Sequence, residues 1–251
     1  MSEQPEYHLE ISNLTMAYAD NIILKELNFK VRQGEIFIIM GGSGCGKSTL
    51  LRHLVGLMQP HTGQILVDGI DLWQASEEER NQIISRCGVL YQGGALWSSM
   101  TLAENLEVPL REYTDLNSRQ INEVISYKLS LVGLAGFEDY FPSEISGGMQ
   151  KRAGLARAMA LDPDILFFDE PSAGLDPISS RRLDELILQL RQSLGTTIVI
   201  VSHELASIFA VGDNSIFLDP DSKTIIARGA PRQLLESSAD QRVRNFLTRT
   251  T

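Results

Sequence analysis

A glycine-rich segment at residues 41–49 constrains the fold of this chain more than any other feature. It fits the pattern G-x-x-x-x-G-K-[ST], in which backbone N–H groups cradle the phosphates of a nucleotide. Residues 35–40 before it are apolar and predict a buried strand, and residues 48–55 after it predict the opening of a helix. The sequence therefore predicts binding of ATP or GTP by Gly41, Gly42, Ser43, Gly44, Cys45, Gly46, Lys47, Ser48 and Thr49.

Composition narrows the class of protein. The formal charge of −10 argues against a nucleic-acid partner, because phosphate-backbone binders show a basic face. The two cysteines, Cys45 and Cys87, have no metal-ligand spacing, so we expect a reducing cytosol and no disulfide. No signal peptide is evident, and no apolar run approaches the ~20 residues of a membrane span. Any role at a membrane is expected to come through a partner.

The periodicity along the chain predicts an α/β fold. Residues 8–33 alternate apolar and polar in two runs, which predicts a hairpin. Strands and helices then alternate, except that the pattern is almost wholly helical from about residue 101 to 161. The economical interpretation is a parallel α/β core interrupted by a helical insert. The further strands are predicted at 64–69, 87–92, 165–168 and 196–201, and further helices at 76–86 and 178–194.

Two carboxylates end a predicted strand. Asp169 and Glu170 follow the apolar run 165–168, and strand ends in open α/β sheets face the ligand crevice. In a P-loop enzyme Asp169 would hold Mg²⁺ and Glu170 would orient or deprotonate the attacking water. Without the P-loop, a pair of solvated carboxylates would be a plausible alternative.

Two further polar residues end predicted strands. His203 could hydrogen-bond the γ-phosphate, although a histidine that caps the next helix is an equal alternative. Gln92 could ligate Mg²⁺ and touch the attacking water, but alone it is weak evidence. Ser146, Gly147 and Gly148 precede a helix predicted from Met149, which gives either a second anion-binding terminus or an ordinary glycine-rich helix start.

The chain carries, in order, the P-loop, Gln92, Ser146-Gly147-Gly148, Phe168-Asp169-Glu170, Ser172-Ala173-Gly174-Leu175-Asp176 and His203. This order and spacing resembles the ATP-binding subunit of ABC transporters over nearly the whole chain. The resemblance implies an α/β P-loop NTPase core with a mixed sheet, an N-terminal antiparallel β subdomain and a helical subdomain insert. It implies one domain over 1–251, with a core at about 1–92 and 162–230, the helical subdomain at about 93–161 and a C-terminal tail at about 230–251.

The resemblance also assigns roles. Tyr18 matches the aromatic residue on which the family stacks adenine, with a strand-edge tyrosine as the alternative. Glu170, His203 and Gln92 would be catalytic, and Ser48, Gln92 and Asp169 would hold Mg²⁺ beside ATP. Two copies would form a head-to-tail dimer, in which Ser146, Gly147 and Gly148 contact the ATP of the partner copy. Met149 replaces the usual glutamine of this signature, so the contact that glutamine makes is in doubt.

The single ATP module, short insert and acidic balance favour a transporter subunit over a soluble ABC ATPase. A P-loop kinase would give no reason for Ser146-Gly147-Gly148 ahead of Asp169-Glu170. The segment 92–102 is where such subunits grip a membrane permease, although Trp97 could equally anchor the helical subdomain. This segment, the signature and residues 240–247 look like the ATPase of Mla-type phospholipid transporters. That likeness implies a permease, a lipid-binding MCE protein, a small STAS-domain protein and a peripheral location at the cytoplasmic side of the inner membrane. An importer or exporter of another substrate is the alternative.

The C-terminal tail has two possible places. The resemblance implies that it reaches the neighbouring ATPase or the STAS protein. Val243, Phe246 and Leu247 lie at helical spacing, and a terminal helix docked on its own domain would explain them equally well.

Overall fold

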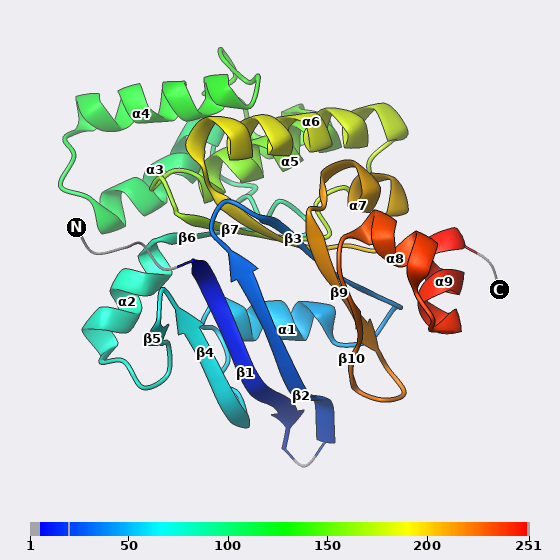
Figure 1. Cartoon of the computed structure of the whole chain (residues 1–251). Coiled ribbons are helices and arrows are strands. Elements are labelled where there is room, and N and C mark those ends of the chain that lie inside the picture. Colours follow the sequence, from blue (N-terminus) through cyan, green and yellow to red (C-terminus); the bar gives the residue numbers. More distant parts are fainter. Residues whose placement is uncertain (1–5, 20, 250–251) are drawn as a thin grey trace.

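The N-terminal part of the chain is an antiparallel sheet. The structure, a computed structural model, describes residues 6–19 and 21–249. The predicted hairpin is confirmed, and its strands join a sheet of order β2-β1-β4-β5 (Figure 1). Its strands are β1 (Tyr7–Tyr18), β2 (Asn21–Arg32), β4 (Thr62–Val67) and β5 (Ile70–Asp71).

The second sheet is mixed, as predicted. Its order is β10-β9-β3-β8-β7-β6, with parallel pairing from β9 to β6 and an antiparallel edge strand β10. The order brings the ends of β3, β8 and β7 together, although long stretches of sequence separate them. The strands are β3 (Ile36–Gly41), β6 (Cys87–Leu90), β7 (Ile165–Asp169), β8 (Thr197–Val201), β9 (Asn214–Asp219) and β10 (Thr224–Arg228).

The parallel strands are buried on both faces. Along β3, Ile36, Ile38 and Met40 face one hydrophobic cluster, while Phe37 and Ile39 face the other. The second cluster fills the space between the two sheets, where α1 (Lys47–Leu54) lies (Figure 1). Such two-sided burial explains why these strands read as continuous apolar runs rather than as an alternating pattern.

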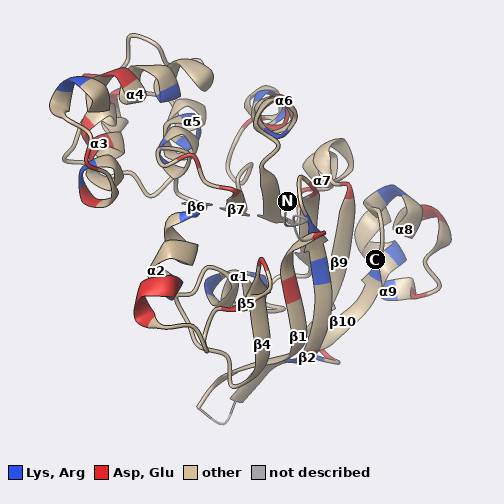
Figure 2. Cartoon of the chain, turned by 60° about the vertical axis from the view of Figure 1, so that its left-hand side comes forward, with Lys and Arg blue, Asp and Glu red and all other residues tan. Residues whose placement is uncertain are grey.

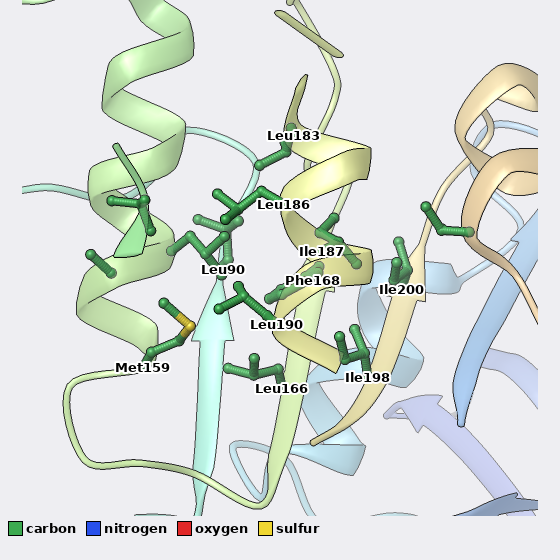
Figure 3. Close-up of a cluster of buried hydrophobic side chains, with 14 of the residues drawn as sticks. Leu90, Met159, Leu166, Phe168, Leu183, Leu186, Ile187, Leu190, Ile198 and Ile200 are labelled. Carbon is green, nitrogen blue, oxygen red and sulfur yellow. The ribbon is translucent and has the colours of Figure 1, made fainter. Parts of the chain in front are cut away.

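Helices cover the other face of the mixed sheet. Helix α6 (Pro177–Leu194) directs a row of leucine and isoleucine side chains onto β6, β7 and β8 (Figure 3). Its apolar spacing is the 3.6-residue period of an amphipathic helix. The labelled contacts include Leu183, Leu186, Ile187 and Leu190 from the helix and Leu90, Leu166, Phe168, Ile198 and Ile200 from the strands.

The predicted helical stretch forms three helices and a short 3₁₀ turn. Capping boxes begin the first two, with Thr101 and Glu104 at one and Asn117 and Gln120 at the other. The third begins at Gly147, two residues earlier than predicted, because Ser146 is its N-cap and glycine is tolerated in a first turn. These elements are α3 (Leu102–Tyr113), α4 (Ser118–Leu131), η1 (Pro142–Glu144) and α5 (Gly147–Ala158).

The C-terminal helices pack on the core of their own chain. Val243 and Leu247 are buried, and the ring of Phe246 lies edge-on to Phe217 of β9 with centroids 5.0 Å apart. Arg242 donates to the carboxylate of Asp219 at 2.8 Å. The remaining helices are α2 (Glu77–Ser85), α7 (Leu205–Val211), α8 (Pro231–Ser237) and α9 (Gln241–Thr248). Within the described ranges, no helix is long and apolar enough to span a bilayer.

Candidate functional site

A cavity of about 800 Å³ lies where the parallel strands end. The loops after β3, β6, β7 and β8 all contribute to it, as expected for the ligand crevice of an open α/β sheet. The C-terminal helix closes one side. The cavity is lined by Ile23, Gly41, Gly42, Ser43, Gly44, Gly46, Lys47, Ser48, Thr49, Gln92, Glu170, His203, Leu205, Asn245, Phe246 and Arg249.

The P-loop is built to accept an anion. The ammonium of Lys47 donates to the carbonyl oxygens of Gly41 and Gly42, each at 2.9 Å, which holds its charge at the mouth of the loop. Helix α1 begins after Gly46 without a side-chain cap, so its first amides meet no competing side chain. Gly41 admits no side chain, since a Cβ there would lie 2.5 Å from the carbonyl oxygen of Leu218.

Cys45 is the P-loop residue that turns inward. Its side chain is 2% exposed, and burial raises the pKa of its thiol. The residue therefore packs beneath the loop as a small apolar group, and its predicted part in ATP binding is limited to its backbone.

Two oxygen donors meet beside Lys47. The hydroxyl of Ser48 donates to Oδ1 of Asp169 at 3.0 Å, so the P-loop and the end of β7 are in contact. A hydroxyl and one carboxylate suit Mg²⁺, which takes hard oxygen ligands and usually keeps waters and substrate phosphates. The part of the chain that the structure describes has no cluster of three His, Cys, Asp or Glu residues able to hold a metal. Any ion here would need oxygens from the nucleotide.

Glu170 and His203 form a pair. Nδ1 of the imidazole lies 2.7 Å from Oε1 of Glu170, and the backbone N–H of His203 donates to Oε2 at 3.4 Å. Glu170 is 8% exposed, while the histidine side chain is 53% exposed. The backbone of Glu170 has φ 50°, a rare value for a non-glycine residue, and its N–H donates to Val201 at 2.9 Å. The end of β8 and the residues that follow it thus hold Glu170 at the cavity.

Two other predicted nucleotide contacts differ in their position relative to the cavity. Gln92 lines the cavity from the loop after β6 and is exposed. Tyr18 lies outside the cavity lining, where its hydroxyl contacts the sulfur of Met58 at 3.6 Å and 46% of the residue is exposed. Ile23, on the neighbouring strand β2, lines the cavity instead.

The signature residues lie apart from this cavity. Ser146 and Gly147 are exposed at the start of α5, and neither they nor Gly148 line the space around the P-loop. The hydroxyl of Ser146 accepts from the N–H of Met149 at 3.3 Å. Ser146 and Gly147 are thus accessible to another molecule at the N-terminal end of α5, where backbone amides lack intrahelical partners.

Sequence reasoning missed the contribution of α9. Asn245, Phe246 and Arg249 line the nucleotide-sized cavity, and the guanidinium of Arg249 lies 3.3 Å from the carboxylate of Glu204. That same carboxylate lies 3.8 Å from Nε2 of His203. The sequence contains no local signal that α9 lines the cavity, since this depends on how the C-terminal helices fold back onto the core.

A second cavity, of about 490 Å³, lies at the opposite ends of the parallel strands, where β6, β7 and β8 begin. Its charged groups pair with one another: Arg86 donates to Asp164 at 2.6 Å and to Asp68 at 2.7 Å. Burial lowers the pKa of His8, which contacts Thr197 of the core sheet. These contacts join the antiparallel sheet to the core.

Comparisons with known proteins agree with the geometry. The ABC transporter family model matches residues 24–173. The "Intermembrane phospholipid transport system ATP-binding protein MlaF" of Haemophilus influenzae is 42% identical over 95% of this chain and 89% of its own length. The protein of the same name from Escherichia coli is 39% identical over 95% of this chain and 88% of its own. The "Probable ribonucleotide transport ATP-binding protein mkl" of Mycobacterium bovis is 41% identical over 95% of this chain but only 66% of its own.

Solved structures show the same fold. The cbiO1 protein of Clostridium perfringens, part of the ABC transporter complex cbiONQ, superposes with a TM-score of 0.84 at 26% identity, covering 93% of this chain and 92% of that one. A dimeric ATP-binding cassette in a post-hydrolysis state, bound to ADP and phosphate, gives 0.79 at 28% identity, covering 88% and 97%.

Proposed function

The chain belongs to the ABC transporter family, and from that premise we propose that it hydrolyses ATP to drive phospholipid transport between the membranes of a Gram-negative envelope. ATP binding and hydrolysis coupled to transport are properties of the family. The phospholipid substrate is the finer part of the proposal. It rests on the identity of 42% to an intermembrane phospholipid transport protein over nearly all of both chains.

Ribonucleotide transport is the second candidate. A relative named for it is 41% identical, which is nearly as high. This chain spans only 66% of that relative, whereas it spans 89% of the phospholipid one, and the fuller match favours phospholipid.

The described residues can perform the hydrolysis in ordinary steps. Lys47 would bind the β- and γ-phosphates together with the P-loop amides. Glu170 would accept a proton from the attacking water, since its carboxylate reaches the cavity and its backbone is hydrogen-bonded to Val201 of β8. His203, 2.7 Å from that carboxylate, would orient it and touch the γ-phosphate. Gln92 would help to position the water from the opposite loop.

The residues present fit a magnesium ion. Ser48 and Asp169 would hold it together with phosphate oxygens, and Gln92 could add an amide oxygen. When bound, the ion would neutralise charge that develops on the phosphates during transfer.

A second copy of the chain would complete the site. Ser146 and Gly147 are exposed and, like Gly148, lie outside the lining of the chain's own cavity, as a contact in trans requires. A dimeric cassette among the structural relatives supports a self-dimer. ATP would bridge the copies only while its γ-phosphate is present, so hydrolysis would open the dimer.

A groove beside α3 is the proposed docking place of the membrane permease. Its volume is about 780 Å³, and Trp97, Val108 and Tyr113 are exposed large side chains along it. Across the groove stands α2, with its acidic first turn shown in red in Figure 2. Exposed apolar groups gathered in one groove are typical of a protein interface. The chain itself would lie at the cytoplasmic side of the inner membrane. An MCE protein would join the assembly through the permease, and a small STAS-domain protein would be reached by the C-terminal tail.

Affinity purification tests the proposal. Tagged Glu170→Gln protein is recovered from its native membranes with ATP present, and the proteins and lipids that come with it are identified by mass spectrometry. A permease, an MCE protein and enriched phospholipid are expected. Lys47→Ala, which should not bind nucleotide, is the matched control for recovery that depends on ATP.

Other outcomes contradict it in specific ways. A permease with a solute-binding protein, or enriched ribonucleotide without phospholipid, would keep the ATPase and overturn the substrate. Recovery of no membrane partner would instead favour a soluble ABC ATPase.

A further inference from the structure

A polar cluster is buried where α6, α7 and the loop after β7 meet. Its members Ser172, Asp184 and Ser207 are 4%, 7% and 5% exposed, although neighbours such as Leu183 and Ile208 belong to the apolar core. None of the three is among the described residues that line the cavity beside the P-loop. A buried carboxylate destabilises a fold relative to apolar side chains, so the cluster calls for an explanation besides stability.

Ser207 makes all the contacts that join this cluster. Its Oγ lies 2.9 Å from Oδ2 of Asp184 on α6. The hydroxyls of Ser172 and Ser180 each lie 3.4 Å from the same Oγ. A hydroxyl has one proton and two lone pairs, so Ser207 donates to the carboxylate at the shortest contact and can accept from the two serines. One side chain thus connects α7 to α6 and to the loop after β7.

The cluster lies on the two chain segments that leave the pair of Glu170 and His203. Strands β7 and β8 are neighbours, and the N–H of Glu170 donates to the carbonyl of Val201 at 2.9 Å. Beyond that bond the segments diverge, since one runs from Glu170 to α6 and the other from His203 into α7. Ser207 rejoins them through its contact with Ser172.

Few flexible bonds separate Ser207 from the pair. The N–H of Ile208 donates to the carbonyl of Glu204 at 3.0 Å, so Ser207 lies in the first turn of α7, close behind the histidine. On the other segment, the N–H of Ala173 donates to the carbonyl of Glu170 at 3.1 Å. The loop after β7 therefore turns tightly at the point where it contacts Ser207.

We propose that Ser207 is a positioning residue for ATP hydrolysis, whose hydroxyl holds the loop after β7 against α7 and so keeps His203 at 2.7 Å from Glu170. The inference deepens the proposed function and rests on it, because it takes Glu170 as the base of the reaction. Ser207 acts through this pair and not on the nucleotide.

Ser207→Ala tests the role in the protein recovered from native membranes with its partners. We expect the Kd for ATP to stay within about 3-fold, since the P-loop is unchanged. The kcat should fall roughly 10-fold, because a displacement of about 1 Å at a catalytic group can cost about 10²-fold. Ser207→Thr keeps the hydroxyl and should retain most of the rate.

The imidazole of His203 gives a readout other than activity. In the full-length chain with isotope-labelled histidine, its NMR resonances are assigned from their loss in His203→Ala. Ser207→Ala should move them toward the values found in Glu170→Gln, which lacks the carboxylate partner of the ring. A serine that only stabilises the fold would leave these resonances in place.

Ser215→Ala is the matched control. Ser215 is fully buried, donates to the carbonyl of Gly229 at 2.6 Å and is not among the described residues that line the cavity. Both alanine variants lose a buried hydroxyl, so both should melt at lower temperature. Only Ser207→Ala should change kcat and the His203 resonances.

Ser172→Ala is the second variant if Ser207→Ala does not fold. It removes the contact with the loop after β7 and leaves the contact between Ser207 and Asp184 in place. It should lower kcat at least about 3-fold.

Wild-type kcat in Ser207→Ala overturns the proposal, as does wild-type kcat in Ser172→Ala where the first variant does not fold. A lower kcat with unmoved His203 resonances also overturns it. Wild-type turnover by Glu170→Gln would instead overturn the proposed base, which separates the two failures.

Discussion

At the scale of single residues, the end of β7 is tightly constrained. Glu170 has a rare positive φ, is almost buried and is held by a backbone bond to Val201 and a side-chain contact to His203. Backbone strain of this kind persists only where surrounding contacts over-determine it, and it gathers at functional sites. The carboxylate can therefore keep one orientation toward an attacking water.

Glu170→Gln should retain ATP affinity and lose roughly 10²–10⁴-fold in hydrolysis, the usual contribution of a general base. Glutamine has nearly the same shape but cannot accept the proton. Equilibrium ATP binding and single-turnover hydrolysis measure the two effects separately. Lys47→Ala is the comparison, since it should lose binding itself, and near-normal turnover by Glu170→Gln would exclude the residue as base.

The P-loop residues could be predicted because the phosphate site is a local motif, with strand, loop and helix contiguous in sequence. Asp169 could be predicted from its place after an apolar strand, although its contact to Ser48 spans 121 positions. The contribution of Arg249 to the cavity could not, because it depends on how α9 folds back onto the core. The roles assigned to Tyr18 and the signature residues stay predictions.

At the scale of elements, α3 is joined to the loop before it by one buried side chain. Asn105 is fully buried, and its amide accepts from the N–H of Trp97 and donates to the carbonyls of Trp97, Met100 and Thr101. All four contacts lie within the turn that presents Trp97 to the groove. A single amide thus fixes the shape of this loop.

Asn105→Ala should destabilise the protein by roughly 2–4 kcal/mol, because several backbone groups lose their partner at once. Asn117→Ala, which removes an exposed cap of α4, should cost only about 1 kcal/mol. Urea unfolding gives both values. Equal losses would mean that the loop finds other partners for its backbone.

Element boundaries show where sequence patterns fail. The predicted strand 87–92 ends at Leu90, because the chain leaves the sheet to form the loop with Gln92. Strands β9 and β10 were not predicted, since their short apolar runs gain significance only from tertiary pairing, of β9 with β3 and of β10 with β9. Helix α2 was predicted well, because Ser76 and the acidic residues after it form a complete local capping signal.

At the scale of the whole molecule, stability should depend on pH through a contact between α6 and α7. Burial raises the pKa of Asp184 to about 6 from its ordinary 3.8, while a hydrogen bond from Ser207 at 2.9 Å partly offsets this. The folded state holds the proton more tightly than the unfolded chain does. Stability is therefore lost as pH rises from about 4 to about 6, and the penalty is complete above that range.

Asp184→Asn should raise the unfolding free energy at pH 7.5 by about 1–2 kcal/mol, after allowance for solvent screening. The amide oxygen can still accept from Ser207, and no charge is buried. Near pH 4 the variant and the parent should be equally stable. Thermal melts at the two pH values check this, and a gain of the same size at both would contradict it.

Assembly with a membrane partner should depend on the groove beside α3. Trp97→Ala should reduce the permease recovered with the chain at least about 5-fold while ATP affinity is unchanged, since exposed aromatic anchors dominate interfaces. Tyr127→Ala, an exposed aromatic on α4 that does not line the groove, is the control. Unchanged recovery would leave Trp97 as an anchor of the helical segment only.

The position of α9 has a practical consequence for protein engineering. Asn245, Phe246 and Arg249 line the same cavity as Lys47. A purification tag or fluorescent fusion joined shortly after Arg249 would start beside a residue that lines this cavity. Fusions at the N-terminus are the safer choice for calorimetry and turnover assays.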